Sequence, residues 1–440
     1  MRILHYLSEV TLEHGGVVRS VLDFSTALTH AGHEITLACF DDTSVPAAWK
    51  APVPGGTGLR PVLAGQTGSI NASLEPGQRP GPPKTPRAIT LSWPSLPKPI
   101  RRFRWPDVQT IAREIASCDV LHLHGPWEST NAQLAAIARR LKKPYVLSIH
   151  GMMDDWCMAQ GALKKRFYTW WRVRRMAERA AAVLFTAEGE KRQVMKWFPG
   201  VPDERARVLP LLFDASDFTT LPGPELARAK FEALRTDGPI ILFLSRLHPK
   251  KGVETLIDAA AILKREQQRF RLVIAGSGPI EYENELRRRA VDAGLSDRTY
   301  FLGMVTGREK VSLYQAADVC VLPTSQENWG FVILESLAAG TPVVTTKGVD
   351  IWPELQAGGG TIIADGTAQG IAQAVRKLLE EPEGFEAMRR SGRDWVMGWL
   401  EPLRVVGAYE SLYQECVKRT RRDESLGTSG SETSNGVPTL

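Results

Sequence analysis

The order of apolar and polar residues alternates between short apolar runs and segments of helical period. In the first part of the chain, "RILHYL" and "EITLACF" flank a segment whose apolar residues recur at helical spacing. Later apolar runs of this part lie at 119–125, 144–151 and 181–187, with helical segments around 130–141 and 163–182. Because buried strands separated by helices build parallel sheets covered on both faces, this pattern predicts an α/β fold.

The second part repeats this alternation more regularly. Its apolar runs are 239–245, 270–276, 299–303 and 318–323, and helical segments separate them. We therefore predict two doubly wound, Rossmann-like domains, 1–215 and 216–400, with ligands gathered at the carboxyl ends of the strands.

Three segments depart from this alternation. Residues 43–100 are rich in proline and predict a long irregular excursion. Residues 401–420 carry one apolar stripe, which predicts a helix that packs back toward the N-terminal domain. The polar tail, 421–440, has too little apolar surface to order itself, so we expect it to be disordered.

Composition narrows the function classes only modestly. The chain has 440 residues, 43% hydrophobic and 24% charged, with a net charge of +6 and a pI near 9.0. That balance suits an anionic ligand but alone predicts neither nucleic acid nor lipid, and we expect no nucleic-acid partner. Five scattered cysteines indicate a reducing compartment without disulfides or a zinc site. With no secretory signal and no apolar run long enough to span a membrane, we expect a cytoplasmic, soluble protein.

Two cations follow the first apolar run of the second part. Arg246 comes directly after that run, and Lys251 precedes Gly252 at the start of a helical segment. Cations beside the unpaired N–H groups of a helix N-terminus form a good receptor for a diphosphate. A solvated basic turn is an equally good interpretation of these residues alone.

Two glutamates lie in "ENWGFVILESLAAGTPVV". Glu327 stands in the turn before a helix, where ligands gather, and Glu335 lies inside that helix among apolar neighbours. A carboxylate in such surroundings is costly unless it is paired or bound to a ligand. For Glu335, an ion pair with a basic side chain is the slightly better interpretation from placement alone.

The motifs "FLSRLHPKKG", "VIAGSGP", "FLGMV" and "PTSQENWGFVILESLAAGTPVV", in this order and spacing, resemble family 4 retaining glycosyltransferases of the GT-B fold. The resemblance extends over most of residues 1–420. It implies two Rossmann-like domains facing across a cleft, a nucleotide-sugar donor and retention of the anomeric configuration.

The resemblance also implies residue roles in the second part. Glu327 would be catalytic beside the donor sugar, and Glu335 would hold ribose hydroxyls. The implied donor-binding residues are Arg246 and Lys251 for the diphosphate, the N–H groups of Phe331 and Val332 for the phosphates, and Val305 beside the base. Trp329 replaces the more frequent phenylalanine and is expected to reshape a wall of the donor pocket.

In the first part, "HGGVVRS" resembles the family's glycine loop, which implies donor-binding roles for Gly15 and Gly16; an ordinary tight turn is the alternative. "SIHGMMDDW" resembles the segment whose histidine lies across the cleft near the anomeric carbon, which makes His150 a catalytic candidate. From its residues alone, His150 is better interpreted as structural. His122 and His124 are weaker candidates on the acceptor side.

We expect the reaction to be independent of metal. Asp154 and Asp155 are adjacent and lack the Asp-x-Asp spacing with which metal-dependent sugar transferases hold a divalent cation. Arg246, Lys251 and helix N–H groups can neutralise the leaving diphosphate instead. We therefore expect no cofactor, with a UDP-sugar or GDP-sugar as substrate.

Residues 164–179 combine many basic residues with four aromatic ones. This composition is compatible with attachment to the inner, anionic face of a membrane as a peripheral protein. A solvated helix whose aromatic side chains face the core is an alternative of at least equal weight.

The resemblance thus predicts a hexosyltransferase that serves polysaccharide or glycolipid biosynthesis and acts on a glycan or lipid-linked acceptor. Two alternatives remain open. One is a nucleotide-sugar-binding protein without transferase activity, which would bind donor without turnover. The other is a different enzyme of the same architecture, an epimerase or a phosphorylase.

Overall fold

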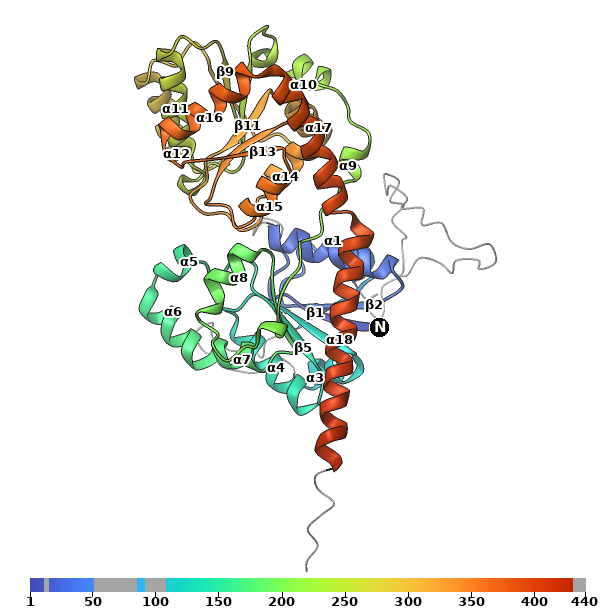
Figure 1. Cartoon of the computed structure of the whole chain (residues 1–440). Coiled ribbons are helices and arrows are strands. Elements are labelled where there is room, and N and C mark those ends of the chain that lie inside the picture. Colours follow the sequence, from blue (N-terminus) through green and yellow to red (C-terminus); the bar gives the residue numbers. More distant parts are fainter. Residues whose placement is uncertain (12–15, 51–84, 92–107, 430–440) are drawn as a thin grey trace, which may run out of the picture. The chain divides into compact units, whose positions relative to one another are not determined.

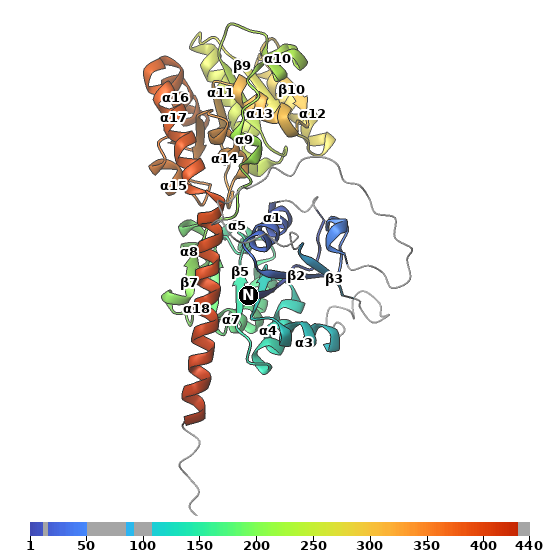
Figure 2. The same cartoon turned by 90° about the vertical axis from the view of Figure 1, so that its right-hand side faces the viewer.

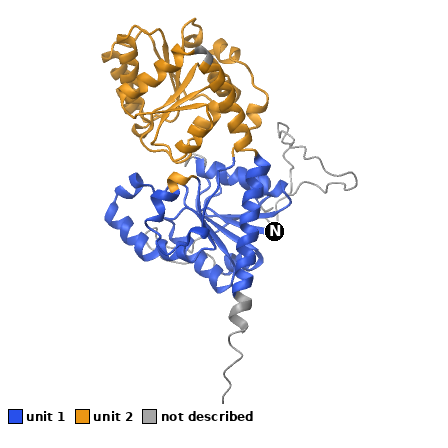
Figure 3. Ribbon diagram, in the orientation of Figure 1, with its two compact units in different colours: residues 1–186, 191–212, 402–440 blue, residues 187–190, 213–401 orange. Residues whose placement is uncertain are grey.

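The computed structural model describes residues 1–11, 16–50, 85–91 and 108–429, and the chain forms two compact units (Figures 1 and 3). Unit 1 consists of Met1–Thr186, Lys191–Leu212 and Pro402–Leu440. Unit 2 consists of Ala187–Glu190 and Phe213–Glu401.

Unit 1 is built on a seven-stranded sheet in the order β3-β2-β1-β4-β5-β6-β7, and every neighbouring pair is parallel. Its strands are β1 (Arg2–Tyr6), β2 (Glu34–Cys39), β3 (Arg87–Thr90), β4 (Val120–His124), β5 (Tyr145–Ser148), β6 (Ala182–Phe185) and β7 (Ala206–Val208). The strand order reverses between β1 and β4, which is where ligands gather in open α/β sheets.

Helices cover both faces of this sheet. They are α1 (Gly16–His30), α3 (Val108–Ser117), α4 (Ser129–Arg140), α5 (Asp155–Ala159), α6 (Ala162–Tyr168), α7 (Arg174–Glu178) and α18 (Pro402–Ser429). Helix α18 is one continuous helix alongside the unit (Figure 2). Its apolar stripe, with Tyr409 and Tyr413, packs with Phe24 of α1 against Ile3 and Val120 of the sheet. Helices α3, α4 and α7 supply side chains to the core on the other face.

Unit 2 has a six-stranded parallel sheet in the order β10-β9-β8-β11-β12-β13. Its strands are β8 (Ile240–Leu244), β9 (Arg271–Ala275), β10 (Thr299–Gly303), β11 (Val319–Leu322), β12 (Val343–Thr346) and β13 (Thr361–Ala364). Its helices are α9 (Ser216–Thr219), α10 (Glu225–Lys230), α11 (Val253–Arg265), α12 (Ile280–Asp292), α13 (Gly307–Ala316), α14 (Phe331–Ala338), α15 (Trp352–Ala357), α16 (Ala368–Glu380) and α17 (Pro382–Trp399), while α8 (Glu188–Met195) crosses from unit 2 into unit 1. The order reverses between β8 and β11, as it does in unit 1.

The structure corrects two predictions about irregular segments. Within 43–100, Ala47–Trp49 form a 3₁₀ turn and β3 pairs with β2 as the edge strand of the sheet, because strand pairing satisfies backbone groups that local sequence leaves open. The rest of that excursion lies outside the described residues. Disorder of 421–440 is wrong for 421–429, which continue α18, because extending an anchored helix costs little. Residues 430–440 lie outside the described residues.

All five cysteines are free thiols. In the part of the chain that the structure describes, no helix is both long enough and apolar enough to cross a membrane.

Candidate functional site

The loops after β8 and β11 of unit 2 bring together Arg246, Lys251 and Glu327, far apart in sequence. Strands β8 and β11 are neighbours at the point where the strand order reverses, so their carboxyl ends meet at one edge.

Close backbone packing positions the loop after β8. The Leu247 N–H donates to the Ser277 carbonyl at 2.9 Å. A Cβ atom on Gly276 would lie 1.8 Å from the Ser245 carbonyl oxygen, so only glycine allows this approach. Gly252 adopts φ +73° against the Pro323 carbonyl and is the N-cap of α11. The loop therefore holds exposed Arg246 and half-buried Lys251 on a rigid turn.

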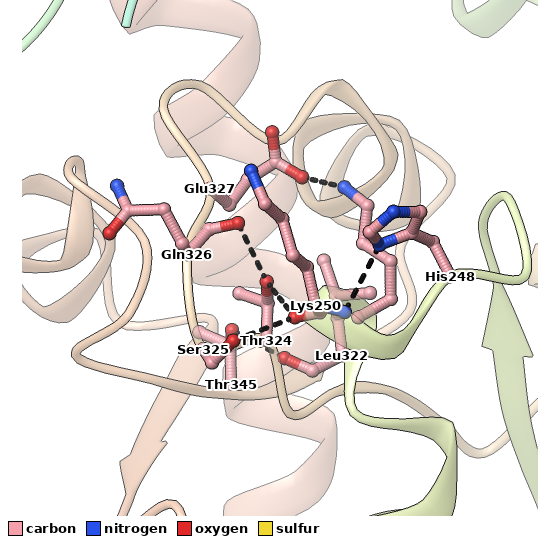
Figure 4. A network of polar contacts seen from close by, with 9 residues as sticks. His248, Lys250, Leu322, Thr324, Ser325, Gln326, Glu327 and Thr345 are labelled. Atoms are coloured by element: carbon pink, nitrogen blue, oxygen red, sulfur yellow. Dashed lines mark hydrogen bonds and ion pairs between the residues drawn. The ribbon is translucent and has the colours of Figure 1, made fainter. Parts of the chain in front are cut away.

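Lys251 and Glu327 form an ion pair through Nζ and Oε2. Figure 4 shows the polar network beneath them: the Lys250 carbonyl accepts from Thr324 Oγ1 at 2.9 Å and from the Ser325 N–H at 2.9 Å. The Glu327 N–H also donates to the Gly348 carbonyl at 2.8 Å. These hydrogen bonds fix the main chain next to Lys251 and at Glu327, and so position both members of the ion pair.

The charge of Lys251 depends on its surroundings. Burial and the neighbouring cations Arg246 and Lys250 lower the pKa of Lys251 to about 8. The carboxylate of Glu327 acts in the opposite direction, because contact with an anion favours the protonated amine.

Helix α14 begins directly after this turn. Gly330 adopts φ +69° at its N-cap and offers no side-chain oxygen. The first N–H groups of a helix have no partner within the helix, and Phe331 and Val332 carry two of them. A helix N-terminus with such donors favours an anion.

Glu335 is paired in the structure. Its Oε1 lies 2.7 Å from Nζ of Lys310, and its Oε2 accepts from the Tyr314 hydroxyl at 3.1 Å. Lys310 and Tyr314 are one turn apart on α13, so one helix face provides both partners. The interpretation of Glu335 as an ion-pair member is confirmed, and its role toward ribose stays a prediction.

Val305 and Trp329 are both buried. Val305 follows Gly303, which has φ +69° and accepts a hydrogen bond from the Gly276 N–H at 2.7 Å. Trp329 packs against Trp399 of α17, with ring centroids 5.4 Å apart. With only 3% of its surface exposed, Trp329 contributes to the packing of α17, and its expected effect on a wall of the donor pocket stays a prediction.

A cavity of about 780 Å³ opens at the same edge of the sheet, toward β12 and β13. Its lining includes Thr324, Lys347, Gly348 and Asp365. None of the predicted donor residues lines it, so we do not assign the donor to this cavity.

In unit 1, His150 follows β5 at the carboxyl edge of the sheet. It has φ +56°, which is rare for a residue with a side chain, and Gly151 follows with φ +70°. Such an outlier persists only where its surroundings enforce it, and it often marks a functional position. Here the Trp127 Nε1–H donates to the Met152 carbonyl at 2.8 Å and holds the loop. Gly16 begins α1, whereas Gly15 lies outside the described residues.

The structure corrects the expectation for His122 and His124. Both are buried in the interior of unit 1, and His122 lies 2.7 Å from both the Tyr413 hydroxyl and Ser148 Oγ. They do not face an acceptor from an open surface.

The two adjacent aspartates have structural partners. The Asp154 carboxylate caps α5 by accepting from the Cys157 N–H at 2.5 Å. Asp155 forms an ion pair with Lys196.

Sequence reasoning missed three residues that contact predicted ones: Lys310 and Tyr314, which hold Glu335, and His5, whose Nδ1 lies 3.0 Å from Nε2 of His124. The first two are ordinary positions of an amphipathic helix. His5 interrupts the apolar run "RILHYL", which was the one available signal, because an imidazole inside a buried strand needs partners.

Comparisons with known proteins agree across both units. The family model of the glycosyl transferases group 1 matches residues 227–395, and that of Glycosyltransferase Family 4 matches residues 14–217. The GDP-mannose-dependent alpha-(1-6)-phosphatidylinositol monomannoside mannosyltransferase of Mycobacterium tuberculosis is 30% identical over 284 residues, 61% of this chain and 70% of that protein. The alpha-monoglucosyldiacylglycerol synthase of Streptococcus pneumoniae is 30% identical over 216 residues, 47% of each chain.

Solved structures agree on the fold. HepE of Anabaena, crystallised with UDP, superposes with a TM-score of 0.68 at 17% identity and covers 93% of this chain and 99% of its own. A glycosyltransferase from Rickettsia africae gives a TM-score of 0.69 at 15% identity and covers 95% and 98%. The two parallel sheets with interleaved helices therefore belong to the GT-B fold that the sequence predicts.

Proposed function

This chain belongs to the family 4 glycosyltransferases of the GT-B fold, and from that premise we propose that it moves a hexose from a nucleoside diphosphate sugar to a glycan or lipid-linked acceptor. We propose further that the configuration at the anomeric carbon is retained and that no metal ion is required. Family membership makes the chain a glycosyltransferase, so a binding protein without activity, an epimerase and a phosphorylase are no longer favoured.

The observation that supports this proposal is the meeting of Arg246, Lys251 and Glu327 beside the N-terminus of α14. A nucleoside diphosphate leaves with negative charge, and two cations with the N–H groups of Phe331 and Val332 can stabilise that charge. In the absence of donor, Glu327 neutralises Lys251. A bound diphosphate would replace Glu327 as the partner of Lys251 and free its carboxylate for the sugar hydroxyls.

The remaining roles follow the resemblance to the family. Glu335, already held by Lys310 and Tyr314, would accept from the ribose hydroxyls, and Val305 would lie beside the base. Gly15 and Gly16 would approach the donor phosphates. His150 would hydrogen-bond to the sugar or the acceptor.

The chemical step is a substitution at the anomeric carbon. The bond from that carbon to the diphosphate oxygen breaks, and a bond to the acceptor oxygen forms on the same face. The acceptor's proton passes to the departing diphosphate. In this scheme the positive charge that develops on the sugar and the negative charge on the phosphate are both stabilised by fixed groups, and no covalent sugar–enzyme bond is formed.

A ligand screen tests the donor proposal. The thermal unfolding of the full chain is measured with UDP, GDP and ADP and with their hexose conjugates, in buffer containing a metal chelator. A true donor at about 100 times its dissociation constant should stabilise the native state by roughly 2.7 kcal/mol. Stabilisation by none of them would contradict the proposal, and stabilisation that needs added Mg²⁺ or Mn²⁺ would contradict metal independence.

We also propose that unit 1 contacts an anionic membrane surface through residues 164–179. Phe167, Trp170 and Trp171 expose 62%, 65% and 44% of their surface, so the alternative that these side chains face the core is wrong for them. Beside them is a concavity of about 340 Å³ whose charged lining residues are all basic: Arg139, Arg140, Arg172, Arg175 and Arg179. Exposed aromatics next to arginines are typical of proteins that dock on anionic lipid.

Vesicle flotation tests the membrane proposal. The full chain should float with vesicles that contain phosphatidylglycerol and remain unbound with phosphatidylcholine alone. Phe167→Ser with Trp170→Ser should abolish flotation, whereas Ile280→Ser, at an equally exposed position of unit 2, should not. Equal binding to both kinds of vesicle would contradict the electrostatic part of this proposal.

A further inference from the structure

Two buried histidines of unit 1, His5 and His124, and the partly exposed His150 form a hydrogen-bonded chain of side chains that ends at His150. Nδ1 of His124 lies 2.9 Å from Nε2 of His150, and Nε2 of His124 lies 3.0 Å from Nδ1 of His5. His5 and His124 are 0% and 3% exposed, on the neighbouring strands β1 and β4. This histidine chain therefore runs from the core of unit 1 to the carboxyl edge of its sheet.

The histidine chain has an imidazole nitrogen without a partner at each of its two ends. Among the residues that the structure describes, neither Nε2 of His5 nor Nδ1 of His150 has a hydrogen-bond partner, and both atoms are buried. Burial lowers the pKa of His5 to about 3 and that of His150 to about 4, and it lowers the pKa of His124 well below its usual range. All three rings are therefore neutral near pH 7.

Counting protons leaves two arrangements. Three neutral imidazoles carry three N–H protons on six nitrogens, and each of the two hydrogen bonds uses one N–H and one lone pair. The third proton must then be at one free end, either Nε2 of His5 or Nδ1 of His150. His5 is fully buried in the core, whereas His150 is partly exposed at the edge of the sheet. Because an unpaired N–H deep in a core is rarer than an unpaired lone pair, the arrangement with the proton on His150 is favoured.

We propose that His5 and His124 are positioning residues that hold His150 in the tautomer with its proton on Nδ1. His5 donates to His124, His124 donates to Nε2 of His150, and Nδ1–H remains as a donor at the edge of the sheet. This inference rests on the proposed role of His150 in sugar transfer. It makes His150 a hydrogen-bond donor to a substrate oxygen and prevents it from accepting the acceptor's proton, in agreement with transfer of that proton to the diphosphate.

A metal ion is the competing occupant of this region, because nitrogens of His5, His122 and His124 lie within 4.8 Å of one another. The contacts of His122 argue against it. Its two nitrogens each lie 2.7 Å from a hydroxyl group, of Tyr413 and of Ser148, so its hydrogen-bonding capacity is already used. A bound cation would also have to replace the hydrogen bond between His5 and His124.

Imidazole ¹⁵N NMR of the full chain tests this proposal directly, since the two neutral tautomers differ in the chemical shifts of Nδ1 and Nε2. The chain has eight histidines, and single substitutions assign their signals. We expect wild-type His150 to be protonated on Nδ1. His5→Phe removes the donor that orders the chain and should lower the population of that tautomer, whereas His5→Asn keeps an N–H near the position of Nδ1 and should restore it.

Transfer kinetics give the second readout. His5→Phe should lower kcat by about tenfold or more while the dissociation constant for the nucleoside diphosphate changes less than twofold, and His5→Asn should recover most of kcat. His30→Phe, an exposed histidine of α1, is the matched control and should change neither the tautomer nor kcat.

Three results would overturn the proposal: wild-type His150 protonated on Nε2, a His150 tautomer that is unchanged in His5→Phe, or stoichiometric zinc in the purified protein that is lost in His5→Phe. Failure of the proposed function is distinguishable, because it would appear as normal transfer by His150→Ala while the tautomer result stands.

Discussion

Both units place chemistry at the carboxyl edge of a parallel sheet whose strand order reverses at its centre, but the chemistry differs. In unit 2, the loops after β8 and β11 carry Arg246, Lys251 and Glu327, which are charged and held at the ends of rigid turns. In unit 1, His150 ends a chain of imidazoles that burial keeps neutral. Charged groups suit a diphosphate that departs with negative charge, and a neutral donor suits the orientation of hydroxyl groups.

The largest expected effect comes from removing the carboxylate of Glu327 in unit 2. Glu327→Ala should lower kcat by roughly 100-fold or more, because a group that acts on the developing charge of the sugar is lost. Binding of the nucleoside diphosphate should be kept or become tighter, because Lys251 loses its competing anion. Transfer assays and calorimetry measure the two effects separately.

Glu309→Ala is the control for that variant, since Glu309 forms a surface ion pair with Lys230 in the same unit. Transfer by Glu327→Ala at the normal rate would show that the site is misassigned.

The cations of unit 2 should affect binding more than chemistry. Arg246→Gln and Lys251→Met should each raise the dissociation constant for the nucleoside diphosphate by about 10- to 100-fold, because a hydrogen bond to a charged group contributes roughly 1.5–3 kcal/mol. Calorimetry measures this, with Arg265→Gln on the exposed side of α11 as the control. Unchanged affinity in both variants would place the diphosphate elsewhere.

The pH dependence of binding should reveal the charge of Lys251. The diphosphate binds the protonated amine, whose pKa in the free protein is about 8. Affinity should therefore change little between pH 7 and pH 8 and fall above pH 8 by up to about tenfold per pH unit.

In Lys251→Arg the fall between pH 8 and pH 9.5 should disappear, because an arginine stays charged there. The histidine chain of unit 1 predicts no comparable step between pH 6 and pH 8, because its rings remain neutral over that range. An identical fall in Lys251→Arg would assign the titration to another group.

The smallest expected effect concerns ribose. Wild-type protein should bind a nucleoside diphosphate about tenfold more tightly than its 2′-deoxy analogue, and Glu335→Ala should bind both equally, because a charged acceptor for one hydroxyl is lost. Lys310→Met is the control: it breaks the ion pair of Glu335 but leaves the carboxylate, so discrimination should persist. If both variants still preferred the nucleoside diphosphate over its 2′-deoxy analogue, Glu335 would have its ion-pair role alone.

The sequence predicted the positions of strands and helices better than it predicted the contacts of single side chains. The period of apolar residues was enough to place most strands and helices, because burying an apolar face is a local requirement of each segment. The apolar period did not predict the strand β3, whose structure is decided by pairing with β2. It also did not predict that 421–429 are helical, because they follow an anchored helix. Those outcomes depend on neighbours that are distant in sequence or already packed.

Among the candidate residues, the motif around Glu327 was recognisable because it combines an acid, a glycine with positive φ and a helix start within a few positions. The partners of Glu335 were not, because Lys310 and Tyr314 belong to another helix and look like any surface lysine and core tyrosine. The contact of Trp329 with Trp399 was not recognisable for the same reason, since it joins residues 70 positions apart.

The amino-acid sequence by itself determined the two α/β units, the family and the turns that carry Arg246, Lys251 and Glu327, because these depend on local periods and on backbone conformations that only certain residues adopt. The tertiary structure decided which polar groups meet. The ion pair of Lys251 with Glu327 and the chain from His5 through His124 to His150 arise only when strands from distant parts of the sequence become neighbours. Burial then supplies what no local pattern encodes, because it decides whether a buried polar group must find a partner and whether a histidine is charged.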